Sequence, residues 1–152
     1  MLAIPDIELA APPDARAIAE LSRDYIEHGL GWSWTPPRVL HAMREPSTNV
    51  AVIRQRGSMV AFGIMQYGDD SAHLSLLAVH PTQRHRGLGA HMVGWLEQSA
   101  RAAGIKLVRL EARADNLSAL AFYERLAFTR SGEIAGYYEG RIDAVQLQKK
   151  MT

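Results

Sequence analysis

The stretch of sequence that decides the fold is Val79-His80-Pro81-Thr82-Gln83-Arg84-His85-Arg86-Gly87-Leu88-Gly89-Ala90-His91-Met92. The apolar run before it, from Leu74 to Val79, predicts a buried strand. We expect this strand to end at Pro81, because proline has no N–H for a sheet ladder. After Gly87, apolar side chains recur at three- and four-residue spacing, which predicts a helix: Leu88, Met92, Trp95, Leu96 and Ala100. The sequence therefore predicts a strand, a basic turn containing glycines, and a helix.

The turn between strand and helix predicts an anion-binding site. Gly87 and Gly89 have no side chain, so a ligand can approach the backbone closely. The N–H groups in the first helical turn lack partners, and the helix dipole adds partial positive charge. Arg84, His85 and Arg86 bring further positive charge. We interpret the turn as a pyrophosphate cradle, the alternative being a tight turn without a ligand.

Two familiar phosphate loops do not fit this turn. A Walker loop needs Lys and then Ser or Thr after its last glycine, but Trp95 and Leu96 follow Gly94. The dinucleotide-binding pattern fails at its third glycine, where Met92 stands. The pattern Arg84-x-x-Gly87-x-Gly89 after a strand resembles the acyl-CoA pyrophosphate loop of the GNAT superfamily of N-acetyltransferases.

This resemblance implies that the protein binds acetyl-CoA. Backbone groups of Leu77 and Val79 are expected to hold the pantetheine arm, with an N–H near Leu77 polarising the thioester carbonyl. The expected cofactor contacts in this segment are Leu77, Ala78, Val79, Arg84, His85, Arg86, Gly87, Leu88, Gly89 and Ala90.

A second block, from Glu111 to Phe128, resembles another motif of the same superfamily. The resemblance implies that Asn116 contacts the CoA arm and that Tyr123, four residues after Ala119, protonates the departing thiolate. The alternative is that Tyr123 is a core residue on an apolar helix face. Ala127 stands where the superfamily usually has glycine, and we interpret it as evidence against a left-handed helix cap.

The acceptor side of the site is predicted from the segment Leu110-Glu111-Ala112-Arg113 and the pair Tyr137-Tyr138. These residues look most like the protein Nα-acetyltransferases, including the bacterial ribosomal-protein alanine acetyltransferases. The resemblance implies that Glu111 is the general base and that a hairpin bearing tyrosines lines the peptide site. The alternative is that Glu111 is a solvated strand residue, paired with a neighbouring arginine such as Arg109.

Two indoles are expected at the same end of the site. Trp32 and Trp34 lie between the first two predicted helices and, with Tyr137 and Tyr138, would form an aromatic-walled slot for an extended backbone. The alternative is that both indoles only fill the core.

Composition narrows the class of protein. The 152 residues predict a single domain, 1–152, with 47% hydrophobic and 22% charged residues. A net charge of +1 does not favour nucleic acid as a partner. No apolar run has membrane-spanning length and the first residues lack a signal-peptide pattern, so we expect a cytoplasmic protein without a membrane partner. The absence of cysteine excludes a cysteine nucleophile, and the histidines lack zinc-site spacing, so no metal is expected.

The predicted fold is α/β, or α+β with a mixed sheet, of the GNAT-like acyl-CoA N-acyltransferase type. It has a central, mostly antiparallel mixed sheet with helices on both faces. Strands are predicted at 7–9, 50–56, 59–67, 72–79, 106–112, 128–134 and 141–149, with 72–79 and 106–112 parallel. Outside the segment after Gly87, helices are predicted from Pro12 to His28, from Pro36 to about Arg44, and after a cap at Asn116 or Ser118.

The expected activity is acetyl transfer from acetyl-CoA to a primary amine, by direct attack in a ternary complex. The expected acceptor is a protein or peptide N-terminal α-amino group, whose pKa of about 8 lies below that of lysine at about 10.4. A small-molecule amine acetyltransferase (for an amino acid, a polyamine or a drug) and a non-catalytic acetyl-CoA-binding module remain alternatives. The sequence leaves the acyl chain length and the oligomeric state, a homodimer included, open.

Overall fold

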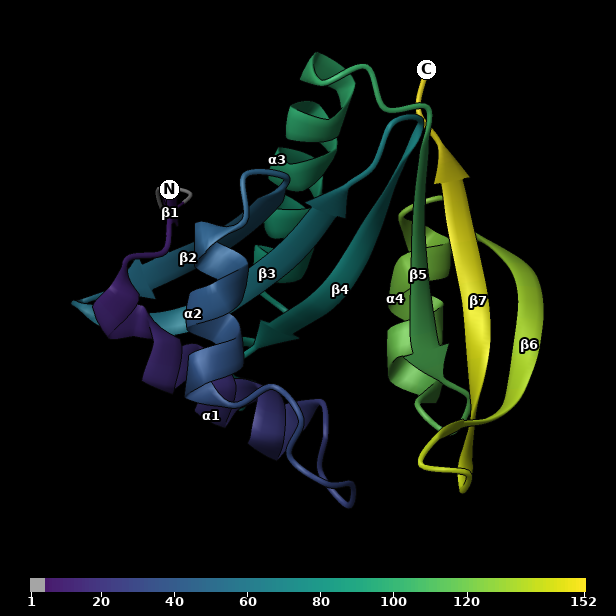
Figure 1. Ribbon diagram of the computed structural model, residues 1–152, viewed down its shortest axis with the longest axis horizontal. Helices are drawn as coiled ribbons and strands as arrows, with labels where there is room; N and C mark the ends of the chain where they lie inside the picture. The colour runs from purple at the N-terminus through teal and green to yellow at the C-terminus, as the bar shows by residue number, and fades with distance from the viewer. Residues whose placement is uncertain (1–4) are drawn as a thin grey trace.

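A computed structural model describes residues 5–152 (Figure 1). Residues 1–4 lie outside the described range. They belong to the N-terminal stretch that lacks a signal-peptide pattern. The strands of residues 5–152 form a sheet with the order β1-β2-β3-β4-β5-β7-β6. Only β4 and β5 run parallel, and the other neighbours in this described sheet are antiparallel, as predicted. The strands are β1 (Ile7–Leu9), β2 (Thr48–Gln55), β3 (Ser58–Tyr67), β4 (Ser71–Val79), β5 (Leu107–Arg113), β6 (Thr129–Tyr138) and β7 (Ile142–Lys150).

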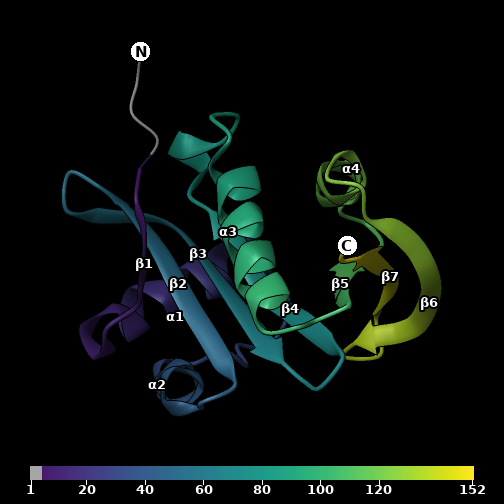
Figure 2. The same cartoon turned by 90° about the horizontal axis from the view of Figure 1, so that it is seen from above.

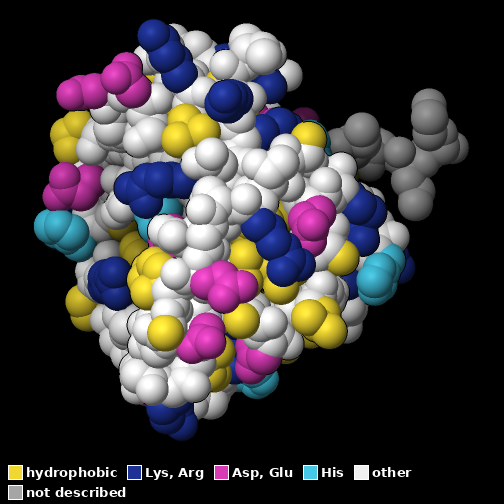
Figure 3. All heavy atoms as spheres, turned by 90° about the vertical axis from the view of Figure 1, so that its right-hand side faces the viewer, with side chains coloured by type: hydrophobic (Ala, Val, Ile, Leu, Met, Phe, Trp, Pro, Cys, Tyr) yellow, Lys and Arg dark blue, Asp and Glu magenta, His cyan; other side chains and the backbone are white. Residues whose placement is uncertain are grey.

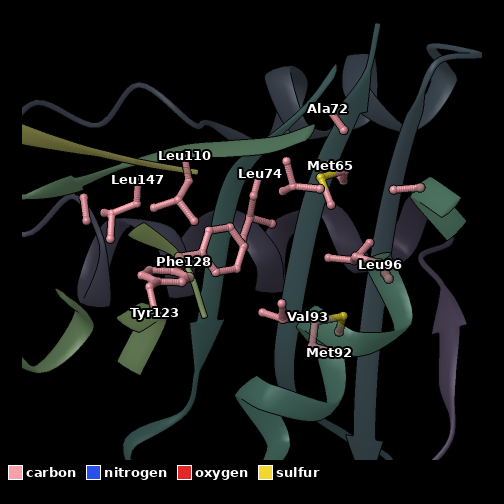
Figure 4. Packing of buried hydrophobic residues seen from close by; sticks show 14 of the residues in the cluster. Met65, Ala72, Leu74, Met92, Val93, Leu96, Leu110, Tyr123, Phe128 and Leu147 are labelled. Carbon is pink, nitrogen blue, oxygen red and sulfur yellow. The ribbon is translucent and has the colours of Figure 1, made fainter. Parts of the chain in front are cut away.

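Helices cover both faces of the sheet, which confirms the predicted layers (Figure 2). One face carries α1 (Ala15–Tyr25) and α2 (Pro36–Arg44), and the other carries α3 (Leu88–Ala102) and α4 (Leu117–Arg125). Each face has its own apolar cluster. The cluster beneath α3 and α4 includes Met92, Leu96, Leu110, Tyr123 and Phe128 (Figure 4), and the cluster beneath α1 and α2 includes Ile18, Val39, Phe62, Ile64 and Leu76.

The sheet splits between β4 and β5. These strands pair only from Ser71 to His73 on β4, and then diverge (Figure 1). Just past that point β4 contains a β-bulge at Ser75, because Met65 pairs with Leu74 while Ile64 pairs with Leu76. A bulge bends a strand and ends regular pairing. The edge of β4 beyond His73 therefore has no strand partner on its β5 side within residues 5–152.

Two predicted boundaries were wrong. The first helix ends at Tyr25 rather than near His28, because the Ile26 and Glu27 N–H groups both donate to the Ser22 carbonyl and close the last turn. The predicted end of β6 at residue 134 was also wrong, since the strand continues to Tyr138. Gly136, which resembles a strand breaker in the sequence, adopts φ +62° in an irregular stretch, and its N–H donates to Asp143.

The interpretation of Ala127 was wrong as well. Ala127 has φ +72°, so α4 does end in a left-handed residue. The Phe128 N–H donates to the Tyr123 carbonyl at 3.0 Å and the Ala127 N–H donates to the Glu124 carbonyl at 3.1 Å. This is the hydrogen-bond pattern of a Schellman motif, in which glycine is the usual left-handed residue. The Phe128 side chain is buried in the core and supplies the apolar contact of the motif. This contact offsets the strain of the positive φ at Ala127.

We expect Ala127→Gly to stabilise the protein. Glycine removes the left-handed strain of about 1–2 kcal/mol but adds unfolded-state entropy of about 0.5–1 kcal/mol. The net gain should be about 0.5–1 kcal/mol, or a rise in Tm of about 2 °C. The matched control is Ala103→Gly at the end of α3, where φ is −84°, and it should lower Tm. Calorimetry of both variants checks this, and a lower Tm for Ala127→Gly would contradict it.

Candidate active site

A groove of about 1090 Å³ occupies the split between β4 and β5 and extends to the start of α3 at one end and to the α1–α2 loop at the other. It brings together most of the predicted site residues. Those that line it are Leu77, Ala78, Val79, Arg84, His85, Gly87, Leu88, Gly89, Ala90, Glu111, Asn116, Tyr123, Trp34, Tyr137 and Tyr138. Arg86 and Trp32 do not line it.

The predicted cradle lies at the start of α3. Gly87 is the N-cap residue with φ +79°, and the His91 N–H makes the first helical bond, to the Gly87 carbonyl at 2.9 Å. The N–H groups of the three residues between them, Leu88, Gly89 and Ala90, therefore have no acceptor in the helix. Arg84 braces the loop by donating from Nε to the Val79 carbonyl at 3.2 Å. The loop can hold an anion on backbone donors.

The two glycines of the cradle serve different purposes. A Cβ on Gly87 would meet nothing within 4 Å, so its positive φ is what favours glycine there. A Cβ on Gly89 would lie 3.0 Å from Cζ of Phe122, so Gly89 lets α4 pack closely against α3. A side chain at Gly89 would disturb this packing as well as any ligand.

Asn116 and Tyr123 both lie on α4. The Asn116 Oδ1 accepts the Ala119 N–H at 3.1 Å and caps the helix, which leaves its NH₂ group as a free donor at the groove. Tyr123 is only 9% exposed and packs edge-on against Phe128, yet it lines the groove (Figure 4). Its hydroxyl has no hydrogen-bond partner among the described residues. Burial raises the pKa of the Tyr123 phenol well above its usual value of about 10.

Glu111 lies on the opposite wall, and its side chain is 11% exposed. Its Oε1 contacts His73 Nε2 at 2.7 Å and accepts the Tyr137 hydroxyl at 3.2 Å, while the guanidinium of Arg109 lies 4.0 Å from Oε2. Glu111 is therefore not the solvated residue of the alternative interpretation, although the arginine expected beside it, Arg109, does lie at ion-pair distance. The hydrogen bond from His73 holds the pKa of the Glu111 carboxyl below its usual range, so this group is a carboxylate at neutral pH.

Contacts of the α1–α2 loop with the β6–β7 hairpin and with the end of β5 close the acceptor end of the groove. The Glu139 carboxylate accepts the Gly31 N–H at 2.7 Å, Arg141 donates to the Gly29 carbonyl, and Arg113 donates to the His28 carbonyl at 2.8 Å. The hairpin also carries Tyr138, packed edge-on against Tyr137, and burial raises the pKa of Tyr138 to about 12. Nothing in the sequence indicated these contacts, which join segments more than 80 residues apart.

The two indoles have different positions. Trp34 is buried in the cluster beneath α1 and α2 and also lines the groove, so it is a core residue, and its contact with an acceptor stays a prediction. Trp32 is 37% exposed, and its Nε1–H donates to the Ala19 carbonyl of α1 at 3.1 Å. Trp32 is therefore not brought to the site.

Sequence reasoning missed the role of Glu27. This carboxylate is 7% exposed and accepts the Ser22 hydroxyl at 2.8 Å and the N–H and hydroxyl of Ser33 at 2.8 and 2.6 Å. It thereby fixes the segment that carries Trp34. A lone glutamate after a helix has no sequence signature that separates it from a solvated one.

We expect Glu27→Ala to lower the free energy of unfolding by about 2 kcal/mol, because it leaves the buried Ser22 hydroxyl and the buried Trp34 N–H without their acceptor. The loosened loop should also raise the KM for the acceptor while leaving acetyl-CoA affinity unchanged. Urea titration and steady-state kinetics check this. Asp24→Ala removes an exposed carboxylate at the end of α1 and should cost under about 0.5 kcal/mol. Equal costs for both variants would contradict the role given to Glu27.

Other features of the described residues concern membranes, metals and surface charge. Within residues 5–152 no helix is long and apolar enough to cross a membrane, and no three acidic or histidine side chains group as metal ligands. The expectation of no metal stays a prediction. On the face beside β6, basic and acidic side chains intermingle (Figure 3), unlike the continuous basic surface typical of nucleic-acid binding.

Comparison with known proteins connects this geometry to a family. The sequence profile of the acetyltransferase (GNAT) family matches residues 15–128. The [ribosomal protein bS18]-alanine N-acetyltransferase of Escherichia coli K12 is 36% identical over 96 residues, covering 61% of this chain and 65% of that protein. The match thus spans slightly less than two thirds of the relative.

Solved structures agree over nearly the whole chain. The ribosomal-protein-S18-alanine N-acetyltransferase from Escherichia coli superposes with a TM-score of 0.83 at 27% identity, covering 98% of this chain and 95% of that one. Ard1 from Thermoplasma volcanium gives a TM-score of 0.87 at 24% identity, covering 97% of both chains. The latter likeness supports the fold alone.

Proposed function

The chain belongs to the acetyltransferase (GNAT) family, and from that premise we propose that it transfers the acetyl group of acetyl-CoA to the α-amino group of a protein or peptide N-terminus. One observation carries the proposal. A single groove runs from the backbone donors of α3, through the split in the sheet, to an end enclosed by the α1–α2 loop and the β6–β7 hairpin. Tyr123 and Glu111 line it from opposite sheet faces.

The cofactor fits the α3 side of this groove. The pyrophosphate binds the N–H groups of Leu88, Gly89 and Ala90, as expected at a helix start preceded by a basic loop. The pantetheine arm extends along the unpaired edge of β4, where backbone groups of Leu77 and Val79 replace the missing strand contacts. The Asn116 NH₂ group donates to the same arm. The thioester then lies at the split.

The reaction is direct attack by the neutral amine on the thioester carbonyl. The N–C bond forms, the C–S bond breaks, and an N–H near Leu77 stabilises the oxyanion. The departing thiolate receives a hydrogen bond or a proton from Tyr123. Burial raises the pKa of the Tyr123 phenol and makes it a weaker acid. The same dry environment also raises the pKa of the CoA thiol, so the difference between the two pKa values stays small.

The acceptor end favours an N-terminal amine over a polyamine. A polyamine site needs carboxylates free to meet several ammonium groups. Here the carboxylates of Glu27 and Glu139 accept backbone N–H groups, and that of Glu111 contacts His73. Tyr137 and Tyr138 leave apolar surface and hydroxyls that suit an extended backbone. The Escherichia coli relative, by its name, acts on the alanine of ribosomal protein bS18. A cytoplasmic location stays a prediction from composition.

An acceptor screen tests the proposed function. The purified protein is given acetyl-CoA with peptides bearing free N-termini, with the same peptides blocked at the N-terminus, and with spermidine and free amino acids. Release of the CoA thiol is measured. We expect release with free N-termini only. Faster release with a small amine would favour the small-molecule alternative, and no release with any amine would favour a non-catalytic module.

A further inference from the structure

His73 lies where the sheet splits and is not among the residues predicted for the site. It is the last β4 residue paired with β5, and its partner in register is Arg109. Its side chain is 22% exposed and lines the groove. Its two ring nitrogens have separate partners, since Nε2 contacts Glu111 Oε1 at 2.7 Å and Nδ1 contacts Ser75 Oγ at 3.3 Å.

The partners determine which nitrogen holds the proton of the neutral ring. An ionised carboxylate only accepts hydrogen bonds, and Glu111 is ionised at neutral pH because its pKa is lowered. The 2.7 Å contact therefore requires a hydrogen on Nε2. Nδ1 is then the basic nitrogen. The Ser75 hydroxyl donates to it, and Ser75 is the bulge residue of β4, which has no partner in the β3–β4 pairing.

This arrangement changes which group can act as the base. A carboxylate with a lowered pKa is a poor acceptor for a proton from an amine at neutral pH. Imidazole is the side-chain base best suited to neutral pH. A carboxylate bonded to the other ring nitrogen orients an imidazole and stabilises its protonated form, as in hydrolytic triads. The other ionisable groups that contact this pair are Arg109 on β5 and Tyr137 on β6.

We propose that His73 holds the proton released by the acceptor amine, with Glu111 as its orienting carboxylate and Ser75 as the hydroxyl through which the proton reaches Nδ1. This inference rests on the proposed function. As the N–C bond forms, the amine proton moves to the Ser75 oxygen while the Ser75 hydrogen moves to Nδ1. The electron pair of the broken C–S bond stays on sulfur, and exchange of the imidazolium proton with solvent restores the site.

The first measurement concerns the ring itself and does not depend on activity. In the protein labelled with ¹⁵N-histidine, NMR should find His73 as the Nε2–H tautomer above the pH at which the ring is neutral. Glu111→Gln should change its Nε2 shift, whereas His41→Gln, an exposed control on α2, should not. The Nδ1–H tautomer would overturn the inference.

The second measurement is the pH dependence of kcat at saturating substrates. In the parent protein, kcat should fall on the acid side as one group takes up a proton. His73→Gln keeps a side-chain N–H for Glu111 but cannot take the proton, so this acid limb should disappear and kcat at pH 7 should fall about 10-fold. The loss is partial because solvent water can still take up the proton.

The outcomes separate this inference from the proposed function. A parent protein that acetylates no amine refutes the function. A parent that acetylates peptides, with His73→Gln keeping both the acid limb and a kcat within twofold, overturns the role of His73 alone. If added imidazole partly restores the kcat of His73→Ala but not that of Ser75→Ala, the role of His73 is supported. An unchanged rate for folded His73→Ala without imidazole would again overturn it.

Discussion

Tyr123→Phe should lower kcat about 10²-fold while leaving the affinity for acetyl-CoA little changed. The phenylalanine ring keeps the edge-on packing against Phe122 and Phe128 and preserves the buried position of Tyr123 in the core. The hydroxyl has no partner among the described residues, so its removal leaves no buried group unpaired. The change therefore deletes only the proton donor that faces the groove.

Steady-state kinetics and calorimetric titration with CoA check this prediction. Thermal unfolding should show no loss of stability, because the deleted hydroxyl makes no hydrogen bond in the described structure. The matched control is Tyr67→Phe, which removes a hydroxyl that accepts a hydrogen bond from Asn49 and does not line the groove. It should lower Tm but leave kcat unchanged. If Tyr123→Phe keeps kcat within twofold of the parent, Tyr123 is a core residue only.

Ala90→Pro should weaken CoA binding about 10- to 100-fold. Ala90 is the third residue of α3, and its N–H precedes the first helical hydrogen bond. Proline there removes a donor that the helix does not use. The preceding residue is Gly89, which tolerates the restriction that proline places on its neighbour. A hydrogen bond to a charged group is worth about 1.5–3 kcal/mol, which corresponds to the expected loss.

Calorimetry with CoA, and circular dichroism as a test of folding, measure the effect of Ala90→Pro. Ala90→Ser adds a small side chain at the same exposed position but keeps the N–H, so it should bind CoA nearly as the parent does. An unchanged affinity in a folded Ala90→Pro protein would contradict the placement of the pyrophosphate at the start of α3.

The features that were predicted from the sequence are those set by local physics. The apolar run ending at Pro81 and the periodicity after Gly87 predicted β4, the loop and α3 in the right order. The crossover rule predicted the parallel pair of β4 and β5. Asn116 was predicted as one of two cap candidates for α4, and its side chain does accept the Ala119 N–H.

The features that were missed depend on tertiary contacts. A bulge at Ser75 leaves no mark in an apolar run, so the split and the pairing of His73 with Glu111 could not be read from composition or spacing. Ala127 adopts a positive φ because core packing of Phe128 offsets the local strain. Likewise, Glu27 and Glu139 resemble solvated acids until the loops that they hold are placed.

The most direct test of the proposed activity uses one peptide that offers both kinds of amine. It has a free N-terminal alanine and one internal lysine, and it is incubated with acetyl-CoA and the parent protein before tandem mass spectrometry locates the product. The α-amine has a pKa of about 8 and the lysine of about 10.4, so far more of the α-amine is neutral at pH 7. We predict a single acetyl group on the alanine nitrogen. Acetylation of the lysine instead, or an unmodified peptide under conditions in which spermidine or free alanine is acetylated, would contradict the account.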